Sequence, residues 1–199
     1  MKDQGFTRAK ALIIVGFRHM AFDIVEAIVH LANRRGQWKG VKGRKKFKQV
    51  FTDPDASFDD DFHTGIGLQI NKTGDLEIEV GTGVYESDII VASPIALRSL
   101  TGLSGSADNE SKVHDFDFLS SLEFLVIDQA EAFNFQNPEH LEEVLKIMNR
   151  RPKKLAGLND INRLKLTCTE TAQGYAKQKL ERSAGLSKLF RQTIILQKF

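Results

Sequence analysis

The chain has 199 residues, of which 41% are hydrophobic and 27% are charged, and its formal net charge is +2. This length suits a single domain over residues 1–199 that buries about 70% of its unfolded surface, and the composition is that of a globular protein. No apolar run approaches the ~20 residues of a membrane span, so we expect neither a membrane segment nor a signal peptide. The lone Cys168 excludes an internal disulfide and is typical of a reducing compartment.

The first βα unit is clear from hydrophobic spacing. A short apolar, β-branched run at residues 11–15 predicts a strand that is buried on both faces. Apolar residues then recur at helical spacing from Ala21 to Ala32, and Gly36 is the expected stop signal.

A strongly basic stretch follows at residues 34–48, with Trp38 and Phe47 interleaved. It has no apolar period, so we predict a loop, and we expect residues 34–62 to form a flexible insertion. One interpretation is a solvated loop whose charge is cancelled by the acidic residues at 53–61. The other is a nucleic-acid contact, in which cations bind phosphates and exposed aromatic rings stack on bases. The residues proposed to contact RNA in this stretch are Arg34, Arg35, Trp38, Lys39, Lys42, Arg44, Lys45, Lys46 and Lys48.

Two further strand regions come next. Alternation at residues 66–70 and 76–80 predicts two short strands joined by a turn. A buried strand at residues 88–92 then leads into a short helix, with Ser93 as the N-cap and Pro94 at the first helical position. A stretch rich in Gly, Ser, Asp and Asn predicts a second flexible insertion near residues 102–117.

The remaining elements complete an alternating pattern. A strand at residues 123–128 ends on Asp128, and a helix begins at Asn137 and ends before Pro152. We predict a further strand at 164–168, a polar helix to about residue 182, and a last strand within 191–199. Strands that alternate with helices predict an α/β fold with a doubly wound, mainly parallel sheet.

Several kinds of catalytic site are missing from these residues. Phosphoryl transfer from ATP uses a glycine-rich loop that ends in Gly-Lys-Ser/Thr, and none of the fifteen glycines is followed by lysine. The five histidines lack the spacing of a zinc site, and no Gly-x-Ser-x-Gly elbow exists. We therefore expect no metal, no cofactor, no small-molecule substrate and no enzymatic activity.

Four segments nevertheless resemble motifs of the first RecA-like domain of DEAD-box RNA helicases. Residues 16–21 resemble Pro-Thr-Arg-Glu-Leu-Ala, and residues 93–97 resemble Thr-Pro-Gly-Arg-Leu with its Gly-Arg pair lost. Residues 191–199 resemble Arg-Gln-Thr-Leu-Leu-Phe-Ser-Ala-Thr, but the final Ser-Ala-Thr is lost. The Asp-Glu-Ala-Asp motif corresponds to Asp128, Gln129, Ala130 and Glu131.

A closer resemblance covers nearly the whole chain. It is carried by Asp3-Gln-Gly-Phe-Thr-Arg8, Tyr85-x-Ser-Asp-Ile-Ile90, Phe118-Leu-Ser-Ser-Leu-Glu123, Ile127-Asp-Gln129 and Leu189-Phe-Arg-Gln-Thr193. These segments are similar to the U-three-associated protein 25, or digestive organ expansion factor, family of the small-subunit processome. Members of that family are longer and carry a second RecA-like half, so the resemblance implies that this chain corresponds to the first half, which lacks the phosphate-binding loop.

The resemblance implies a non-catalytic helicase-like protein of the nucleus and nucleolus that acts in ribosomal RNA processing and small-subunit biogenesis. The implied partners are pre-ribosomal RNA, small nucleolar RNA and other processome proteins. Gln129 also indicates that ATP hydrolysis is lost, because a neutral amide cannot replace the carboxylate that positions the attacking water.

The helicase motifs also nominate RNA contacts by position. They are Arg18, Ser93 and Pro94, with Arg98 as a substitute for the arginine missing at Ala96. The alternative for Ser93 and Pro94 is a plain helix cap. Two alternatives for the whole chain also remain, which are a fragment of an active ATP-dependent RNA helicase whose phosphate loop lies elsewhere, and a purely protein-binding scaffold.

Overall fold

The computed structural model describes residues 7–32, 38–52, 60–103, 115–135, 137–150 and 191–198. In these residues the sheet has six strands in the order β3-β2-β4-β1-β5-β6. The elements in chain order are β1 (Ala11–Ile14), α1 (Arg18–Ala32), α2 (Arg44–Thr52), β2 (His63–Ile70), β3 (Leu76–Thr82), β4 (Ile89–Ala92), α3 (Pro94–Thr101), η1 (Asp117–Leu119), β5 (Phe124–Ile127), η2 (Ala130–Asn134), α4 (Pro138–Ile147) and β6 (Gln192–Ile195).

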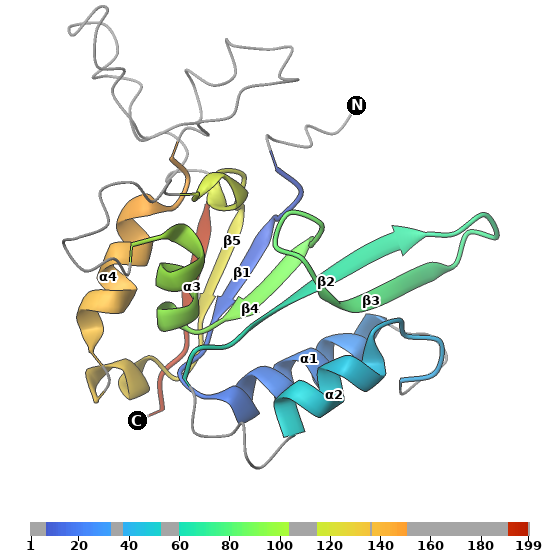
Figure 1. Ribbon diagram of the computed structural model, residues 1–199, viewed down its shortest axis with the longest axis horizontal. Helices are drawn as coiled ribbons and strands as arrows, with labels where there is room; N and C mark the ends of the chain where they lie inside the picture. The colour runs from blue at the N-terminus through green and yellow to red at the C-terminus, as the bar shows by residue number, and fades with distance from the viewer. Residues whose placement is uncertain are drawn as a thin grey trace, which may run out of the picture.

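The predicted α/β fold is confirmed. Strands β4, β1, β5 and β6 run parallel, while β2 is antiparallel to both β3 and β4. Helices α1 and α2 cover one face of the sheet, and α3 and α4 cover the other (Figure 1). Helices on both faces of a mainly parallel sheet make the fold doubly wound.

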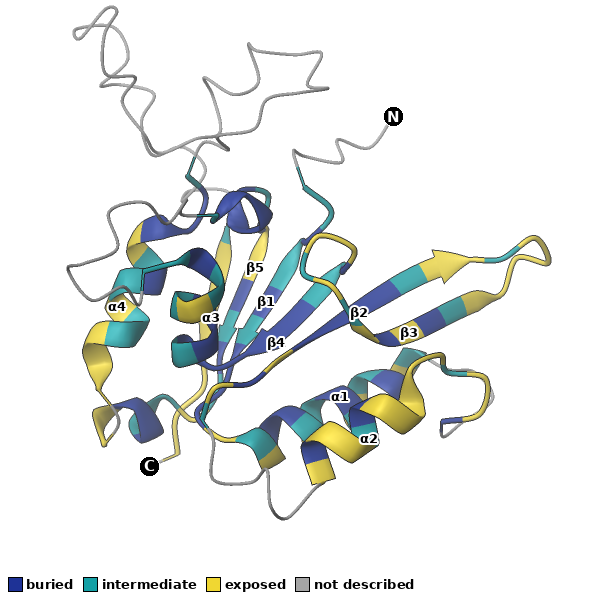
Figure 2. Ribbon diagram, in the orientation of Figure 1, coloured by how far each residue is buried: buried dark blue, intermediate teal, exposed yellow. Residues whose placement is uncertain are grey.

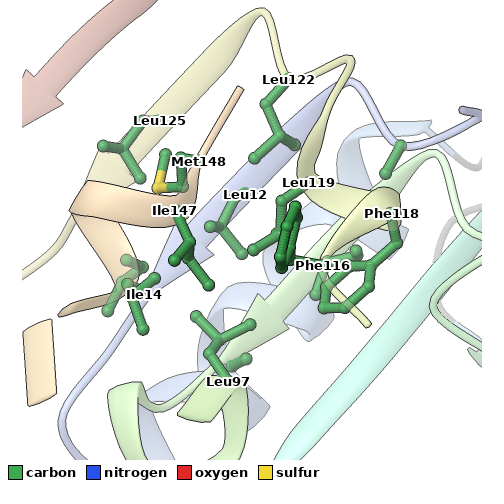
Figure 3. Packing of buried hydrophobic residues seen from close by; sticks show 14 of the residues in the cluster. Leu12, Ile14, Leu97, Phe116, Phe118, Leu119, Leu122, Leu125, Ile147 and Met148 are labelled. Atoms are coloured by element: carbon green, nitrogen blue, oxygen red, sulfur yellow. The ribbon is translucent and has the colours of Figure 1, made fainter. Parts of the chain in front are cut away.

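The two faces have separate hydrophobic cores, because successive side chains of a strand point to opposite faces. Leu12 and Ile14 of β1 pack with α3 and α4, together with Leu125 of β5 (Figure 3). Val15 and Val91 pack on the other side with α1 and α2. Figure 2 shows the resulting pattern, with dark, buried positions on the central strands and on the inner sides of the helices.

The caps of two helices agree with the sequence. The side chain of Ser93 accepts a hydrogen bond from the Ala96 backbone amide, Pro94 takes the first position of α3, and Gly102 ends it with a left-handed φ of 75°. Asn137 caps α4 in the same way by accepting from the Glu139 amide. The predicted hairpin is also present, as the antiparallel pair β2–β3.

One secondary-structure prediction is wrong. The basic stretch was expected to be a loop, but residues 44–48 belong to α2. Phe47 and Phe51 lie one helical turn apart, and both are buried against the sheet side of the helix. Two apolar anchors in nine residues form too short a pattern to reveal a helical period, which is why the sequence suggested a loop.

Some predictions lie outside the described residues. These are the strand at 164–168, the polar helix after it, Cys168, and the RNA contacts Arg34 and Arg35. The single-domain boundary and the two flexible insertions stay predictions. Within the described residues, no helix is both long and apolar enough to span a membrane.

Candidate functional site

The helicase-like motifs that follow β1, β4 and β5 meet at one edge of the sheet. In the parallel register, Ile14 of β1 lies beside Ala92 of β4 and Ile127 of β5. The residues that follow these strands therefore share the carboxyl edge, where α/β proteins bind their ligands. Backbone hydrogen bonds continue past the strands, from the Val15 amide to the Ala92 carbonyl (3.2 Å) and from the Asp128 amide to the Ile14 carbonyl (3.0 Å).

The acidic groups of the degenerate motif are engaged by nearby backbone. Asp128 Oδ1 accepts a hydrogen bond from the Gln129 amide at 3.0 Å. Gln129 itself adopts a left-handed conformation with φ of 50°, which is uncommon for a residue with a side chain. Glu131 Oε2 accepts from the Lys198 amide at 3.3 Å, and the Ala130 amide donates to the Leu196 carbonyl at 2.9 Å. These bonds tie the motif to the segment after β6.

No metal site is evident at this edge. Over the described ranges, no group of three or more His, Cys, Asp or Glu side chains is arranged to hold a metal ion.

Arg18 lies at the start of α1 and joins three elements. Its guanidinium donates to the carbonyls of Val50 (3.3 Å) and Asp61 (3.5 Å). It also lies over the rings of Phe51 and Phe62, 5.6 Å from each centroid. Arg18 thus ties α1 to the end of α2 and to the segment before β2. Its predicted contact with RNA remains a prediction.

Ser93, Pro94 and Arg98 also make contacts within the chain. The Ser93 side chain is buried and caps α3, and Pro94 is buried beside it. The cap that the sequence left open as an alternative is therefore present. Arg98 of α3 forms an ion pair with Glu143 of α4 and also contacts the His140 ring. RNA contacts by these three residues stay predictions.

The basic residues of 38–48 fall into two groups. Four are exposed, and they are Lys39, Arg44, Lys45 and Lys46; the last three form no salt bridge with another described residue. The other two are engaged. Lys42 Nζ donates to Glu77 at 2.9 Å, and this hydrogen bond raises the pKa of Lys42 and lowers that of Glu77. Lys48 Nζ lies 5.4 Å from the centroid of the Trp38 ring.

The expectation of exposed aromatic rings in this stretch is wrong. Trp38 is 4% exposed and Phe47 is 2% exposed, and their rings stack with centroids 5.6 Å apart. The indole Nε1 donates to Glu26 of α1 at 3.1 Å. Burying a large aromatic ring is more favourable than leaving it in water. Here the two buried rings attach α2 to α1 and the sheet.

A second cluster, which sequence reasoning missed, lies at the opposite, amino edge of the sheet. Arg8 precedes β1 and forms a two-point contact with Asp88, which precedes β4. Thr7 donates from its amide to Ser121 Oγ at 2.8 Å, just before β5. Arg191, just before β6, donates to Asn149 at 2.6 Å. Four of the segments that carry the family resemblance contribute residues to this edge. Each of these residues lies just before a parallel strand, and this shared position is the feature of the sequence that could have revealed the cluster.

Comparisons with known proteins cover the same span. A family model described as "UTP25, NTP hydrolase-like domain" matches residues 1–199. U3 small nucleolar RNA-associated protein 25 homolog of Xenopus tropicalis is 32% identical, and the match covers 90% of this chain and 24% of that protein. The human homolog is also 32% identical, over 90% of this chain and 25% of the relative. U3 small nucleolar RNA-associated protein 25 of Debaryomyces hansenii is 35% identical over 77% of this chain and 21% of the relative.

The chain therefore spans about a quarter of the length of the curated relatives that it matches. No solved structure matches it.

Proposed function

The chain belongs to the UTP25 NTP hydrolase-like domain family, and from this premise we propose that it is a non-catalytic, helicase-like part of a small-subunit processome protein. Its relatives are named for association with U3 small nucleolar RNA. The proposed role is to bind RNA and processome proteins during ribosomal RNA processing and small-subunit biogenesis. The proposed partners are pre-ribosomal RNA, small nucleolar RNA and other processome proteins, in the nucleus and nucleolus.

The lack of catalysis is supported by the chemistry of the carboxyl edge. Gln129 stands where the water-orienting glutamate of the helicase motif belongs, and an amide cannot accept a proton from water at neutral pH. The carboxylates of Asp128 and Glu131 accept hydrogen bonds from backbone amides within the chain. The Asp128 carboxylate then serves the local turn after β5, and that of Glu131 connects this turn with the segment after β6.

A nucleotide hydrolysis assay on the full-length protein tests this part. We expect no ATP hydrolysis above background, with or without RNA. Hydrolysis that disappears in the Asp128→Ala variant would instead support the alternative, in which this chain is part of an active ATP-dependent helicase.

The proposed RNA binding rests mainly on one observation, which is the basic outer side of α2. Arg44, Lys45 and Lys46 are adjacent, exposed and positively charged. Clustered lysine and arginine side chains bind phosphates by releasing counterions, so the affinity depends steeply on salt.

Charge neutralisation tests the RNA site. The triple variant Arg44→Gln/Lys45→Gln/Lys46→Gln should bind RNA at least about ten-fold more weakly than the unmodified chain. A matched control changes the same number of charges elsewhere, with Lys10→Gln/Lys72→Gln/Lys146→Gln, and should bind nearly as well as the unmodified chain. Equal losses in both variants would mean that net charge, and not this surface, attracts the RNA.

Binding of processome proteins is supported by apolar side chains at the β6 end of the sheet. In the described residues, β6 is the last strand on its side and all four of its residues are exposed. Ile195 is 61% exposed, the following Leu196 is 48% exposed, and Phe124 of the neighbouring β5 is 45% exposed. Exposed edge strands with apolar side chains are common protein-binding sites.

Crosslinks from purified particles that join these residues to proteins, and the α2 surface to RNA, would agree with both parts of the proposal.

A further inference from the structure

Helix α2 has two sides with different chemistry. Phe47 and Phe51 face the sheet and are 2% and 8% exposed. Arg44, Lys45 and Lys46 in the first turn of the helix are exposed, and Figure 2 shows that α2 carries exposed, yellow positions as well as buried ones. Among the residues that the structure describes, none of these three cations forms a salt bridge. The outer side therefore offers charge and hydrogen-bond donors but no aromatic ring.

The aromatic rings of the same stretch are held in the protein. Phe47 stacks on Phe51 at 4.6 Å as well as on Trp38, measured between centroids. The Lys48 ammonium group lies over the Trp38 ring, and the indole nitrogen of Trp38 donates to Glu26. A nucleobase could stack on these rings only if α2 first separated from its core.

The three cations also work against the local stability of the helix. They occupy its first turn, where no acidic residue is present. The amino end of a helix carries a partial positive charge, so cations there are repelled by the helix dipole. A polyanion bound along the outer side would relieve this repulsion, which makes a negatively charged partner the complementary one.

We propose that the outer side of α2 binds the sugar–phosphate backbone of helical RNA and does not stack on or read bases. This inference rests on the proposed RNA-binding function and specifies its ligand. Single-stranded RNA is usually held by aromatic platforms, which are unavailable on this surface, whereas double-stranded RNA is recognised mainly through its phosphates and shape. A nine-residue helix is about 13 Å long and spans only a few phosphates, so the contact is sequence-independent.

The single tryptophan provides a direct test, because Trp38 is the only one in the chain. The 199-residue chain is titrated with a mixed-sequence RNA duplex, and separately with an unstructured single strand that has the same number of phosphates. RNA anisotropy reports binding, and tryptophan emission reports stacking. We expect several-fold tighter binding of the duplex, with the tryptophan emission unchanged at saturation. Exchanging the base pairs should alter the affinity by less than about two-fold.

The charge variants locate the contact. Arg44→Gln/Lys45→Gln/Lys46→Gln should reduce the slope of log affinity against log salt by about 2 to 3, or about one for each lost phosphate contact. Lys10→Gln/Lys72→Gln/Lys146→Gln should leave the slope nearly unchanged. Both variants alter exposed or partly exposed side chains, and their circular dichroism should match that of the unmodified chain.

The contrary outcomes are distinct. Quenching of Trp38, preference for the single strand, a strong sequence preference, or an unchanged slope in the α2 variant each overturns this inference but leaves RNA binding in place. If the chain binds neither RNA, the proposed RNA-binding function fails as well.

Discussion

Arg8 and Asp88 lie 80 positions apart in the chain and form a two-point contact at the amino edge of the sheet. Arg8 Nε donates to Asp88 Oδ1 at 3.0 Å, and Nη2 donates to Oδ2 at 2.8 Å. Asp88 Oδ2 also accepts from the Leu68 amide at 2.6 Å. The hydrogen bond to Asp88 raises the pKa of the Arg8 guanidinium, so Arg8 remains positively charged over the physiological range. This contact links the starts of β1 and β4 with β2.

Loss of the Asp88 charge should therefore be costly. We expect Asp88→Asn to lower the free energy of unfolding by about 1–2 kcal/mol, because a bidentate, charge-assisted contact becomes a weaker neutral one. Urea denaturation measures the change. The control is Glu123→Gln, which removes a more exposed ion pair with Lys10 at 3.5 Å and should change stability by less than about 0.5 kcal/mol. Equal effects from the two substitutions would contradict the claim that the contact between Arg8 and Asp88 stabilises the fold more than the ion pair between Lys10 and Glu123.

Asn149 is a second connecting residue and predicts a paired result. Its buried amide donates to the Leu122 carbonyl at 2.8 Å and accepts from Arg191 at 2.6 Å, while its backbone has a φ of 58°. Asn149→Ala should lower the free energy of unfolding by about 2–4 kcal/mol, through lost hydrogen bonds and a strained left-handed residue. Asn149→Gly loses the same bonds without the strain, so its loss should be about 1 kcal/mol smaller. If alanine proved the more stable of the two, the backbone argument would be wrong.

Tyr85 predicts a change at alkaline pH. Partial burial, and then the hydrogen bond that its hydroxyl donates to Asp115, raise the pKa of Tyr85 well above its usual value. A folded-state pKa above the unfolded one adds stability below about pH 10, and that stability is lost as the pH rises further. The chain has two tyrosines, so the ultraviolet titration of tyrosinate should contain a late component that Tyr85→Phe removes. A late component that persists in this variant would have to come from the other tyrosine.

A substitution at Phe47 tests whether the basic stretch forms a packed helix and not the predicted loop. Because its ring is buried between α2 and the sheet, Phe47→Ala should destabilise the protein by about 3 kcal/mol or more. Val50→Ala on the same helix removes a side chain that is 43% exposed and should cost less than about 1 kcal/mol. Chemical denaturation of both variants decides the question. A negligible effect of Phe47→Ala would favour the exposed aromatic loop that the sequence suggested.

The centre of the sheet could be predicted because β1 and β4 carry packed side chains on both faces. The apolar runs that became β1, β4 and β5 need no knowledge of their partners, and the Ser93-Pro94 cap is a local signal. Helix α2 was missed because its stability comes from tertiary packing of Phe47 and Phe51, and not from a repeated apolar pattern.

The contacts of the site were harder to foresee. Arg98 is a reasonable RNA ligand by position, but its pairing with Glu143 depends on how α3 packs against α4. The contact between Arg8 and Asp88 depends in the same way on the register of β1 with β4. Such pairs are set by the three-dimensional arrangement, so residue types and spacing along one chain do not reveal them.

The most direct test of the account is RNA crosslinking of the full-length protein in cells, with the crosslinks mapped to peptides. We expect RNA-linked peptides from residues 38–52, and we expect their yield to fall sharply in Arg44→Gln/Lys45→Gln/Lys46→Gln but not in the Lys10, Lys72 and Lys146 control. Crosslinks confined to the carboxyl edge around Asp128, or an RNA contact that is unaffected by loss of the α2 charges, would contradict the account.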